Sequence, residues 1–599
     1  MDRREFIRII GGVSITSAIA PNYAFGDSKN STDGVLVEAA SFQNPGGWVL
    51  DTQFYQQVGG CYLLAHGMGK PVENASTNIE IPSAGEWYIH VRTKDWCPGP
   101  WDAPGQFKMI INGTPLETVF GTQANWSWQS GGKVKLNAGK NKIELQDLTG
   151  FEGRMDAVYF SKNESPLLPN EPKDVLGWKD QMTGRSNMKV ETEEFDVVIV
   201  GGGITGCGAA LAADSQGLKV ALIQDRPLFG GNASSEVRVH TLGIHGKGSD
   251  ILKRIDTKHY PNGDDKAIVC QEKREAEMRK SSVKLFPNNI AVGIEKQGNK
   301  ILSVEARDSS TGTIKRFKAP QFVDCTGDGW LGFWAGADFR YGRESNKEFN
   351  EKWDKHGDLW SPDKADNKVM GTSVLWNSRK SSKPSTFPKV PWAMPVANGN
   401  SAVKGEWYWE YSNDDLNQID DAEQIRDHMF RAIYGNFYLA KRSPKNALVE
   451  LNFVAYVGGR RESRRIIGDH IYKMEDAVKH TYFEDTVVEE TRELDTHFQR
   501  KEKGDKADYL STALFYKVHG KYYIPFRSLY SKDISNLMMA GRCFSCTHIG
   551  LTGPRVMNTC GQMGIATGYA AALCKKHSAS PREVGKTHVK ELRKLIGYS

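Results

Sequence analysis

The sequence predicts a multidomain fold, in which an N-terminal β-sandwich precedes an α/β, Rossmann-like domain that carries an inserted α+β domain. The chain has 599 residues, more than one hydrophobic core can organise. Short strands of alternating apolar and polar residues, separated by turns, run from Val35 to Phe160 and predict the sandwich. A β-branched run at 195–200 leads into a glycine-rich turn and then an alanine-rich helix at 209–213, the strand–turn–helix order of a Rossmann-like domain.

Changes in residue pattern set the expected domain boundaries. Pro166, Pro169 and Pro172 stand among polar residues and mark a linker after the sandwich. Between Arg340 and Tyr456 the α/β pattern gives way to clustered aromatic residues, which indicates either a substrate-binding insertion or the core of a cap. We therefore expect an export signal at 1–26, the sandwich at 35–162, the linker at 163–194, the Rossmann-like domain at 195–345 and 457–599, and the insertion at 346–456.

Composition and charge are those of a water-soluble globular protein. Apolar residues make up 39% of the chain, and the net charge of +6 comes from 78 basic and 72 acidic residues without a long basic run. We therefore expect no nucleic-acid partner.

The first residues resemble a twin-arginine export signal. Arg3 and Arg4 precede a short apolar stretch at 9–20, and small residues near Gly26 offer a cleavage site. The alternative is an ordinary N-terminal helix. The stretch is too short to span a bilayer and no later run is long enough, so we expect a periplasmic or otherwise exported protein without a transmembrane anchor.

The predicted sandwich is similar to a known kind of module. The segments at 46–48, 85–92, 136–139 and 155–158 resemble the galactose-binding-like sandwiches of carbohydrate-binding modules. The resemblance implies a structural calcium ion on Glu38 and Asp156, although Ala40 replaces a second acidic residue. Trp126 and Trp128 could stack on a sugar ring, and core filling explains them equally well.

The nine cysteines predict no metal centre, because only Cys543 and Cys546 show ligand-like spacing. Cys61 and Cys97 lie in the predicted sandwich, where they could pair in an oxidising compartment.

The glycine-rich turn has the spacing of a dinucleotide-binding motif. Gly201 permits a tight turn, Gly203 lets a pyrophosphate approach the backbone, and Gly206 lets the helix pack on the strand. Ile204 and Thr205 begin the helix, whose N-terminal end faces the phosphates with its positive dipole.

A second apolar strand at 219–223 follows the helix and ends in two polar residues. An acidic residue at this position usually accepts hydrogen bonds from the adenosine ribose. Gln224 occupies the expected place and can accept one such bond through its amide oxygen. Asp225 is the alternative if the register differs by one residue.

Two later segments indicate FAD rather than a nicotinamide cofactor. A strand at 321–324 ends in a turn with Gly327 and Asp328, and a strand near 536–540 ends at Gly541 and Arg542. Chain-distant strands that rejoin one sheet suit a long cofactor that spans the domain. The helix at about 554–573 can place its N-terminus near the flavin pyrimidine ring and stabilise negative charge on it.

Several motifs resemble the FAD-dependent oxidoreductase family of heterodisulfide reductase A-like flavoproteins. They lie at 230–236, 324–329, 342–344, 461–465 and 540–548, and the similarity runs from about Asp196 to Cys574. The resemblance implies that Gly231 and Asn232 lie near the flavin, and that Gly541 and Arg542 contact its phosphate or ribitol chain. The chain has no cysteine run of the kind that binds iron–sulfur clusters, so we expect no cluster.

Oxidation of an alcohol by a flavin needs a group that removes the hydroxyl proton. His548 is the first candidate because it follows the 540–542 strand end, with loop orientation as its alternative role. Arg461, Arg464 and Arg555 could orient an oxygen-rich substrate, or could instead form structural ion pairs. His240 follows the glycine pair at a spacing typical of histidyl-linked FAD, which makes a covalent link a further hypothesis.

The sequence therefore predicts an FAD-dependent oxidoreductase that oxidises a carbohydrate or another hydroxylated substrate by hydride transfer. We expect a small-molecule or oligosaccharide substrate and an electron acceptor that the sequence does not identify. One alternative is a reductase of a thiol or unsaturated compound that uses Cys543 and Cys546 as a redox pair. Another is a carbohydrate-binding protein whose flavin domain is catalytically silent.

Overall fold

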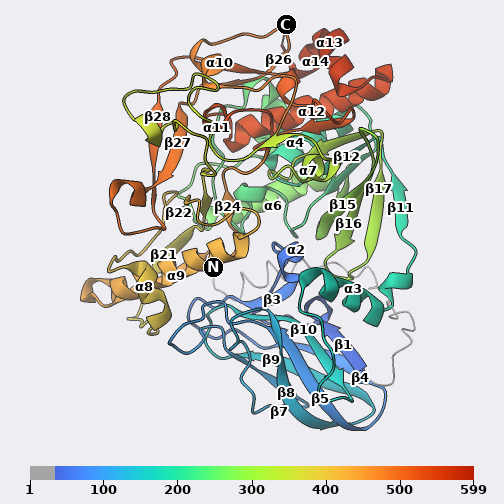
Figure 1. The fold of residues 1–599 in the computed structure, drawn as a ribbon, viewed down its shortest axis with the longest axis vertical. Helices are drawn as coiled ribbons and strands as arrows, with labels where there is room; N and C mark the ends of the chain where they lie inside the picture. The colour runs from blue at the N-terminus through green and yellow to red at the C-terminus, as the bar shows by residue number, and fades with distance from the viewer. Residues whose placement is uncertain (1–33, 599) are drawn as a thin grey trace. The chain divides into compact units, whose positions relative to one another are not determined.

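The computed structural model describes residues 34–598, which form two compact units; the first ends at Lys189 and the second begins at Val190. Figure 1 shows the elements of both units, and the predicted export signal at 1–26 lies outside the described residues. We call residues 34–189 the N-terminal unit and residues 190–598 the C-terminal unit.

The N-terminal unit consists of two antiparallel sheets around one apolar core. Buried side chains of these strands, such as Trp87, Met109 and Phe160, fill the space between the sheets. This confirms the β-rich N-terminal region. One sheet contains β1 (Gly34–Glu38), β2 (Val49–Asp51), β3 (Tyr62–Ala65), β5 (Gly85–Thr93), β8 (Ser127–Leu136) and β10 (Gly153–Ser161); the other contains β4 (Ala75–Ile81), β6 (Phe107–Ile111), β7 (Thr114–Pro115) and β9 (Gly139–Asp147).

The segment predicted as a linker contains a helix that packs on the N-terminal unit. Helix α3 (Pro172–Met182) begins at a proline and carries Trp178 and Lys179. Trp178 makes edge-to-face contacts with Trp128 and Tyr159, with ring centroids 5.5 and 5.2 Å apart. The polar composition that indicated a linker reflects the outer face of this helix.

The structure contradicts the predicted calcium ligands. Asp156 is fully buried, and its two oxygens bind Arg92 Nη1 at 2.7 Å and Lys179 Nζ at 2.5 Å. Glu38 binds Arg185 Nη1 at 2.5 Å. Basic side chains therefore take the place that the ion would have, since a carboxylate neutralised in this way is a poor cation ligand.

The structure also does not bear out the suggested sugar stacking by Trp126 and Trp128 or the suggested disulfide between Cys61 and Cys97. Trp128 donates its indole N–H to Pro169 O at 2.9 Å, and Trp126 packs on Tyr62 with centroids 5.1 Å apart. These contacts give both indoles packing roles and do not favour sugar stacking. Cys61 and Cys97 are buried free thiols, so the suggested pairing does not form.

We predict that Asp156→Ala strongly destabilises the N-terminal unit. It leaves Arg92 and Lys179 buried without their carboxylate, a change that costs about 3–5 kcal/mol in comparable buried pairs. Denaturant unfolding followed by tryptophan fluorescence measures the change. The control is Glu86→Gln, which removes an exposed partner of Lys133 and leaves the unfolding free energy nearly unchanged. An equal effect of both variants contradicts the structural role of Asp156, as does a melting temperature that rises when calcium is added.

The C-terminal unit is built on a five-stranded parallel sheet in the order β14–β13–β12–β18–β30. The central strand β12 is buried on both faces, which explains its uninterrupted β-branched sequence. Its residues pair in register with β13 on one side and β18 on the other, Val197 lying opposite Val220 and Gln321. The strands are β12 (Val197–Val200), β13 (Val220–Ile223), β14 (Lys284–Phe286), β18 (Gln321–Asp324) and β30 (Leu537–Met539), which confirms the four predicted from sequence.

Two helices from opposite ends of this unit pack against each other with their backbones in contact. Helix α4 (Ile204–Ser215) follows β12, and α12 (Met557–His577) follows β30. A Cβ atom at Gly564 would lie 2.0 Å from Thr205 O, and one at Gly568 would lie 2.2 Å from Ala209 O. The contacts advance together along both helices, so α4 and α12 run in the same direction and their N-termini lie at the same edge of the sheet.

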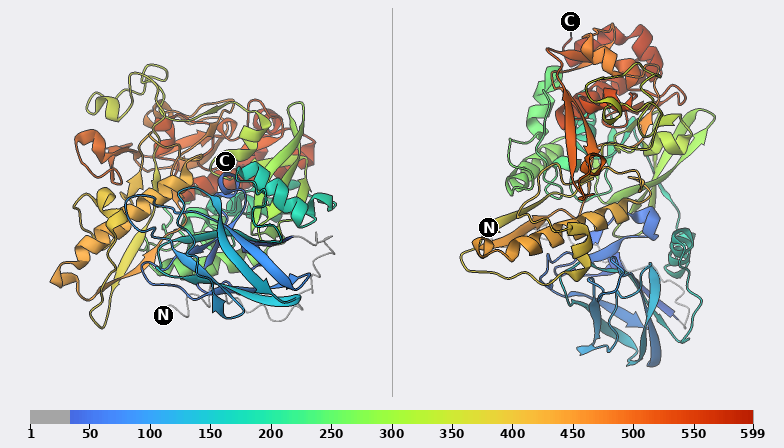
Figure 2. Two further views of the ribbon diagram at one scale, coloured as in Figure 1. Left: turned by 60° about the horizontal axis from the view of Figure 1, so that its bottom comes forward. Right: turned by 60° about the vertical axis from the view of Figure 1, so that its left-hand side comes forward.

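The remaining elements extend or surround this centre. Helices α12, α13 (Pro581–Thr587) and α14 (Val589–Ile596), drawn in red, pack together (Figures 1 and 2). A second sheet contains β11 (Glu191–Glu194), β15 (Asn289–Gln297), β16 (Lys300–Asp308) and β17 (Ile314–Lys318). Further strand groups are β19 (Phe339–Arg340) with β25 (Arg465–Ile466), β20 (Thr372–Ser373) with β22 (Glu410–Tyr411) and β24 (Gly459–Arg460), β21 (Trp376–Lys380) with β23 (Val449–Val454), β26 (Thr486–Glu490) with β29 (Tyr522–Pro525), and β27 (Leu494–Gln499) with β28 (Ser511–Tyr516). The other helices are α5 (Ser249–Ile255), α6 (Lys266–Lys280), α7 (Trp330–Ala335), α8 (Met394–Ala397), α9 (Ala422–Lys441), α10 (Met474–Val478) and α11 (His548–Thr552), and no described helix has the length and apolar character needed to cross a membrane.

Candidate functional site

The turn between β12 and α4 forms an open cradle lined by backbone. Gly201 has a φ of 103°, and a Cβ atom there would lie 2.3 Å from Cys325 O, so the position requires glycine. Gly203 caps α4 without a side-chain hydrogen bond, which leaves the N–H groups of the first helical turn without side-chain acceptors. A Cβ atom at Gly203 would meet nothing nearer than Gly231 Cα, 3.9 Å away. The space beside these N–H groups suits an anionic phosphate.

A second glycine turn closes one side of the cradle. Gly230 N donates to Gly202 O at 2.7 Å, and Gly231 follows with a φ of 58°. Asn232, which is half-buried, donates its side-chain N–H to Arg460 O at 2.9 Å. The structure thus brings Gly231 and Asn232 beside the turn, and their place near the flavin stays a prediction.

Gln224, predicted as the acceptor for the adenosine ribose, has a different role in the structure. Gln224 is buried, and its amide oxygen accepts a hydrogen bond from Gly202 N at 2.7 Å. Its amide nitrogen donates to Leu228 O at 3.1 Å, so both ends of the side chain fix the turn. Asp225 is exposed at the end of β13. The role of Asp225 as acceptor for a ribose hydroxyl stays a prediction.

The ends of β18 and β30 carry a charged cluster next to the cradle. Asp328 accepts hydrogen bonds from Arg460 and from Ser463 Oγ, the latter at 2.7 Å, and lies 3.7 Å from Arg542 Nη2. Burial opposes ionisation of Asp328, but the guanidinium groups of Arg460 and Arg542 outweigh it and lower its pKa below the ordinary value. The carboxylate is therefore charged and holds both arginines.

Arg542 has an unused donor that fits a phosphorylated cofactor. Its Nη1 atom is buried and has no hydrogen-bond partner within residues 34–598. Gly327 and Gly541 have φ values of 77° and 87°, and Cβ atoms there would lie 2.3 Å from Arg542 Nη2 and 3.0 Å from Thr205 Oγ1. An unsatisfied guanidinium N–H beside a backbone cradle is what a dinucleotide pyrophosphate would complete.

His548 is buried, and both of its ring nitrogens bind other side chains of the protein. Its Nδ1 lies 2.8 Å from Glu462 Oε2, and its Nε2 lies 2.9 Å from Thr496 Oγ1. Its backbone N–H donates to Glu344 at 2.8 Å. Both ring nitrogens have partners, so the structure supports the alternative role of His548 in orienting its loop.

Arg461 and Arg464 also contact other residues of the protein. Arg461 donates to Ser373 Oγ and to Trp407 O and pairs with Glu410 at 3.2 Å. Arg464 stacks on the rings of Trp330, Phe333 and Phe339, with its Cζ atom 3.9 Å from the nearest centroid. These contacts do not favour a substrate-binding role for either residue.

Arg555, in contrast, lies at the edge of the site just before α12. Its Nη2 donates to Asp495 Oδ1 at 2.9 Å and to His497 Nε2 at 3.0 Å. His497 Nδ1 lies 2.7 Å from Glu410 Oε2. Burial opposes ionisation of Glu410, but Arg461 and His497 hold its pKa well below the usual range, so the carboxylate is charged and Nδ1 of His497 carries the proton.

Sequence reasoning missed Asp495 and His497. Both project from the same face of β27, two residues apart. An aspartate and a histidine that alternate along a strand would have been the available signal.

His240 lies on a segment that joins the glycine turn to the start of α12. Val239 N donates to Asn232 O at 3.0 Å, and Asn558 N donates to Leu242 O at 2.9 Å. His240 is half-buried, its ring lies 4.3 Å from that of His259, and its buried Nδ1 has no hydrogen-bond partner in the described chain, although Asn262 is close. The covalent link at His240 stays a hypothesis.

Cys543 and Cys546 are free, fully buried thiols. Burial raises the pKa of both well above the ordinary value. Because the thiolate is the reactive form, these surroundings do not favour the redox-pair mechanism.

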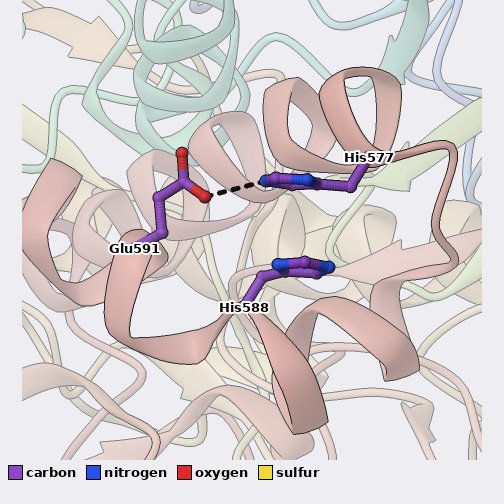
Figure 3. A group of neighbouring side chains, drawn as sticks. All are labelled: His577, His588 and Glu591. Carbon is purple, nitrogen blue, oxygen red and sulfur yellow. Dashed lines mark hydrogen bonds and ion pairs between the residues drawn. The ribbon is translucent and has the colours of Figure 1, made fainter.

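One group of described side chains has the composition of a metal site, although the sequence predicted none. His577, His588 and Glu591 place one ligand atom each within 4.8 Å of the others (Figure 3). The two imidazoles stack at 3.8 Å with planes 5° apart, and Glu591 is paired with Lys576 and His577. Because an imidazole lone pair lies in the ring plane, two parallel rings cannot both point at one ion.

Comparison with known proteins identifies the C-terminal unit. The sequence model of the family described as FAD dependent oxidoreductase matches residues 196–596. The aerobic glycerol-3-phosphate dehydrogenase of Staphylococcus haemolyticus (strain JCSC1435) is 41% identical over 83 residues, 14% of each chain. Glycerol-3-phosphate dehydrogenase 2 of Mycobacterium tuberculosis (strain ATCC 25618 / H37Rv) is 40% identical over 78 residues, 12% of this chain and 13% of the relative. The matches thus span about one seventh of these curated relatives.

Two solved structures show only weak likeness. A family 35 carbohydrate binding module from Clostridium thermocellum is 20% identical with a TM-score of 0.18, over 21% of this chain and 96% of the module. Glycerol-3-phosphate dehydrogenase from Bacillus halodurans complexed with FAD is 18% identical with a TM-score of 0.19, over 24% of this chain and 37% of that chain. At these TM-scores neither likeness defines the fold.

We predict that Gly203→Ala and Gly206→Ala fail in different ways. At Gly203 the φ of −66° accepts any residue and the added methyl enters open space, so the protein folds but binds FAD at least tenfold more weakly. At Gly206 the methyl would lie 1.9 Å from Gly201 O, so helix packing itself fails. Circular dichroism and FAD titration separate the two effects. Undiminished FAD affinity in folded Gly203→Ala protein would contradict the placement of the cofactor.

We predict that Glu351→Gln stabilises the protein above neutral pH. Glu351 Oε1 accepts hydrogen bonds from Met474 N and Thr547 Oγ1, both at 2.7 Å, and burial raises its pKa from 4.5 to about 7. Between pH 4.5 and about 7 the carboxyl group of Glu351 is protonated in the native state but ionised in the unfolded chain. The contribution of Glu351 to stability therefore falls as pH rises from 4.5 towards 7.

The gain in unfolding free energy from Glu351→Gln should therefore be larger at about pH 8 than at about pH 5, by up to roughly 3 kcal/mol. The exposed Glu348→Gln is the matched control and should give the same small change at both pH values. A gain that does not depend on pH would show that Glu351 is ionised in the native state.

Proposed function

This chain belongs to the FAD dependent oxidoreductase family, and we propose that it oxidises a hydroxylated small molecule, with a carbohydrate as the expected class. It is an enzyme and its cofactor is FAD. The names of its relatives, glycerol-3-phosphate dehydrogenases, support a hydroxylated substrate, although the matched segments are short. A closer relationship to the heterodisulfide reductase A-like flavoproteins stays a prediction.

The observation that carries the proposal is the convergence of two helix N-termini at one edge of the sheet. Helix α4 begins at the Gly203 cradle, where its N–H groups would hold the pyrophosphate, with Arg542 beside it. Helix α12 begins next to Arg555, where its positive end would face the flavin pyrimidine ring. When bound, the flavin supplies the hydride acceptor for the reaction. The residues of the chain bind it, orient the substrate and take up a proton.

We assign uptake of the hydroxyl proton to His240 in place of His548. His240 lies between the glycine turn and the start of α12, and its Nδ1 makes no hydrogen bond of ordinary geometry in the described chain, although Asn262 and the backbone of Tyr260 lie beside the ring. Burial, and then the neighbouring His259, lower the pKa of His240, which keeps the imidazole neutral near physiological pH. A neutral imidazole can accept a proton as the substrate is oxidised.

Export and sugar binding are parts of the same proposal. Arg3 and Arg4 before the apolar stretch support twin-arginine export of a folded, cofactor-loaded enzyme to the periplasm. The sequence resemblance of the N-terminal sandwich to carbohydrate-binding modules supports a carbohydrate-related role, and the aromatic residues of the 346–456 insertion would line the substrate side of the flavin.

We predict that a sugar or polyol bleaches the flavin in an anaerobic screen of candidate substrates. His240→Asn should keep its FAD but reduce the flavin about a hundredfold or more slowly, because the proton acceptor is lost. In the wild-type protein the reduction rate should fall on the acid side of pH 6.5, where His240 becomes protonated. His428→Asn is the control, since His428 lies on α9 and its ring nitrogen pairs with Asp508 at 3.0 Å. Failure of every hydroxylated compound, or wild-type speed in His240→Asn, would count against the proposal.

A further inference from the structure

Two arginines share one buried carboxylate beside the start of α12. Arg492 Nη2 donates to Asp495 Oδ2 at 2.8 Å, and Arg555 Nη2 donates to Asp495 Oδ1 at 2.9 Å. The Asp495 side chain is 4% exposed, and although burial opposes its ionisation, Arg555 holds its pKa below the ordinary value. The charged carboxylate therefore fixes both guanidinium groups side by side.

Most of the donors on these two arginines are unused. The Nε atoms of Arg492 and Arg555 are buried without a hydrogen-bond partner. Neither Nη1 atom donates to any group within the described part of the chain. The side chains are 27% and 12% exposed, so each guanidinium is mostly withdrawn from water but still reachable. Two arginines with one shared carboxylate lack hydrogen-bond acceptors.

Two of the buried carboxylates nearby have other partners. Glu490 is buried and accepts hydrogen bonds from Thr559 Oγ1 and from the backbone N–H groups of Thr491, Arg492 and Ile244. Glu410 pairs with Arg461 and His497. Glu493, which is half-buried, and Glu490 add negative charge beside Arg492, and His240 also lies near it, but neither carboxylate accepts a hydrogen bond from the Arg492 side chain in the described chain. The free donor edges of Arg492 and Arg555 thus remain for a ligand.

We propose that Arg492 and Arg555 bind an anionic group of the substrate, a carboxylate or a phosphate, and so select a negatively charged hydroxylated compound over its neutral analogue. The inference rests on the proposed function for its oxidation step, but binding of the anion stands by itself. A planar guanidinium presents paired N–H donors that match a carboxylate or phosphate, and two together hold such a group in one orientation. Asp495 and His497 accept hydrogen bonds from Nη2 of Arg555 and so fix its position.

Calorimetric titration of the FAD-loaded protein with glucuronate, glucose 6-phosphate, glucose and inorganic phosphate tests the proposal. At least one of the two sugar anions should bind, and glucose should bind at least tenfold more weakly. Comparing glucuronate with glucose 6-phosphate and inorganic phosphate shows whether the site recognises a carboxylate or a phosphate. Arg492→Gln and Arg555→Gln should each weaken anion binding about tenfold or more, and Arg→Lys at each position should restore only part of it.

The control is Arg379→Gln, which removes an exposed charge paired with Glu450 and should leave anion binding unchanged. FAD content and circular dichroism confirm that each variant is folded. Absence of anion binding in the wild-type protein, or unchanged binding in both arginine variants, overturns the proposal. Failure of the proposed function looks different: the anions bind in an arginine-dependent way, but no compound reduces the flavin.

Discussion

The contact between α4 and α12 is the constraint on which the rest of the C-terminal unit depends. More than 340 residues separate the two helices, yet Gly564 and Gly568 let α12 lie against the backbone of α4 at Thr205 and Ala209. A side chain larger than hydrogen at either glycine would push the helices apart. Because the helices run in the same direction, this contact fixes where α12 begins relative to the Gly203 cradle.

The loops that complete the site are tied to this centre by buried ion pairs. Asp328 holds Arg460 and lies near Arg542, which joins the ends of β18, β24 and β30. Glu462 and Glu344 hold the loop that carries His548, and Asp495 holds Arg555 at the start of α12. Breaking one partner of such a pair leaves a buried charge, so the loops are fixed more firmly than their irregular backbone suggests.

Local patterns predicted the framework because each depends on neighbouring residues. The run at β12 and the glycines at 201, 203 and 206 report a buried strand and a close turn directly. The ends of β18 and β30 and the glycine-bearing α12 were predicted for the same reason.

Side-chain roles could not be predicted in the same way, because partners come from distant parts of the chain. His548 has a suggestive position, but Glu462 and Thr496 occupy its ring nitrogens. Gln224 stands at the ribose position, yet the Gly202 N–H takes its oxygen. Asp156 looks like an ion ligand until Arg92 and Lys179 are seen beside it. The alternation of Asp495 and His497 along β27 is a signal that the sequence does carry.

The central claim is that the Gly203 cradle and the start of α12 together hold one FAD. Equilibrium titration of folded, cofactor-stripped protein with FAD tests it most directly. The account predicts saturation at one FAD per chain and release of all flavin on acid precipitation, because His240 serves as the proton acceptor and carries no covalent link. Folded protein that binds no FAD would contradict the account.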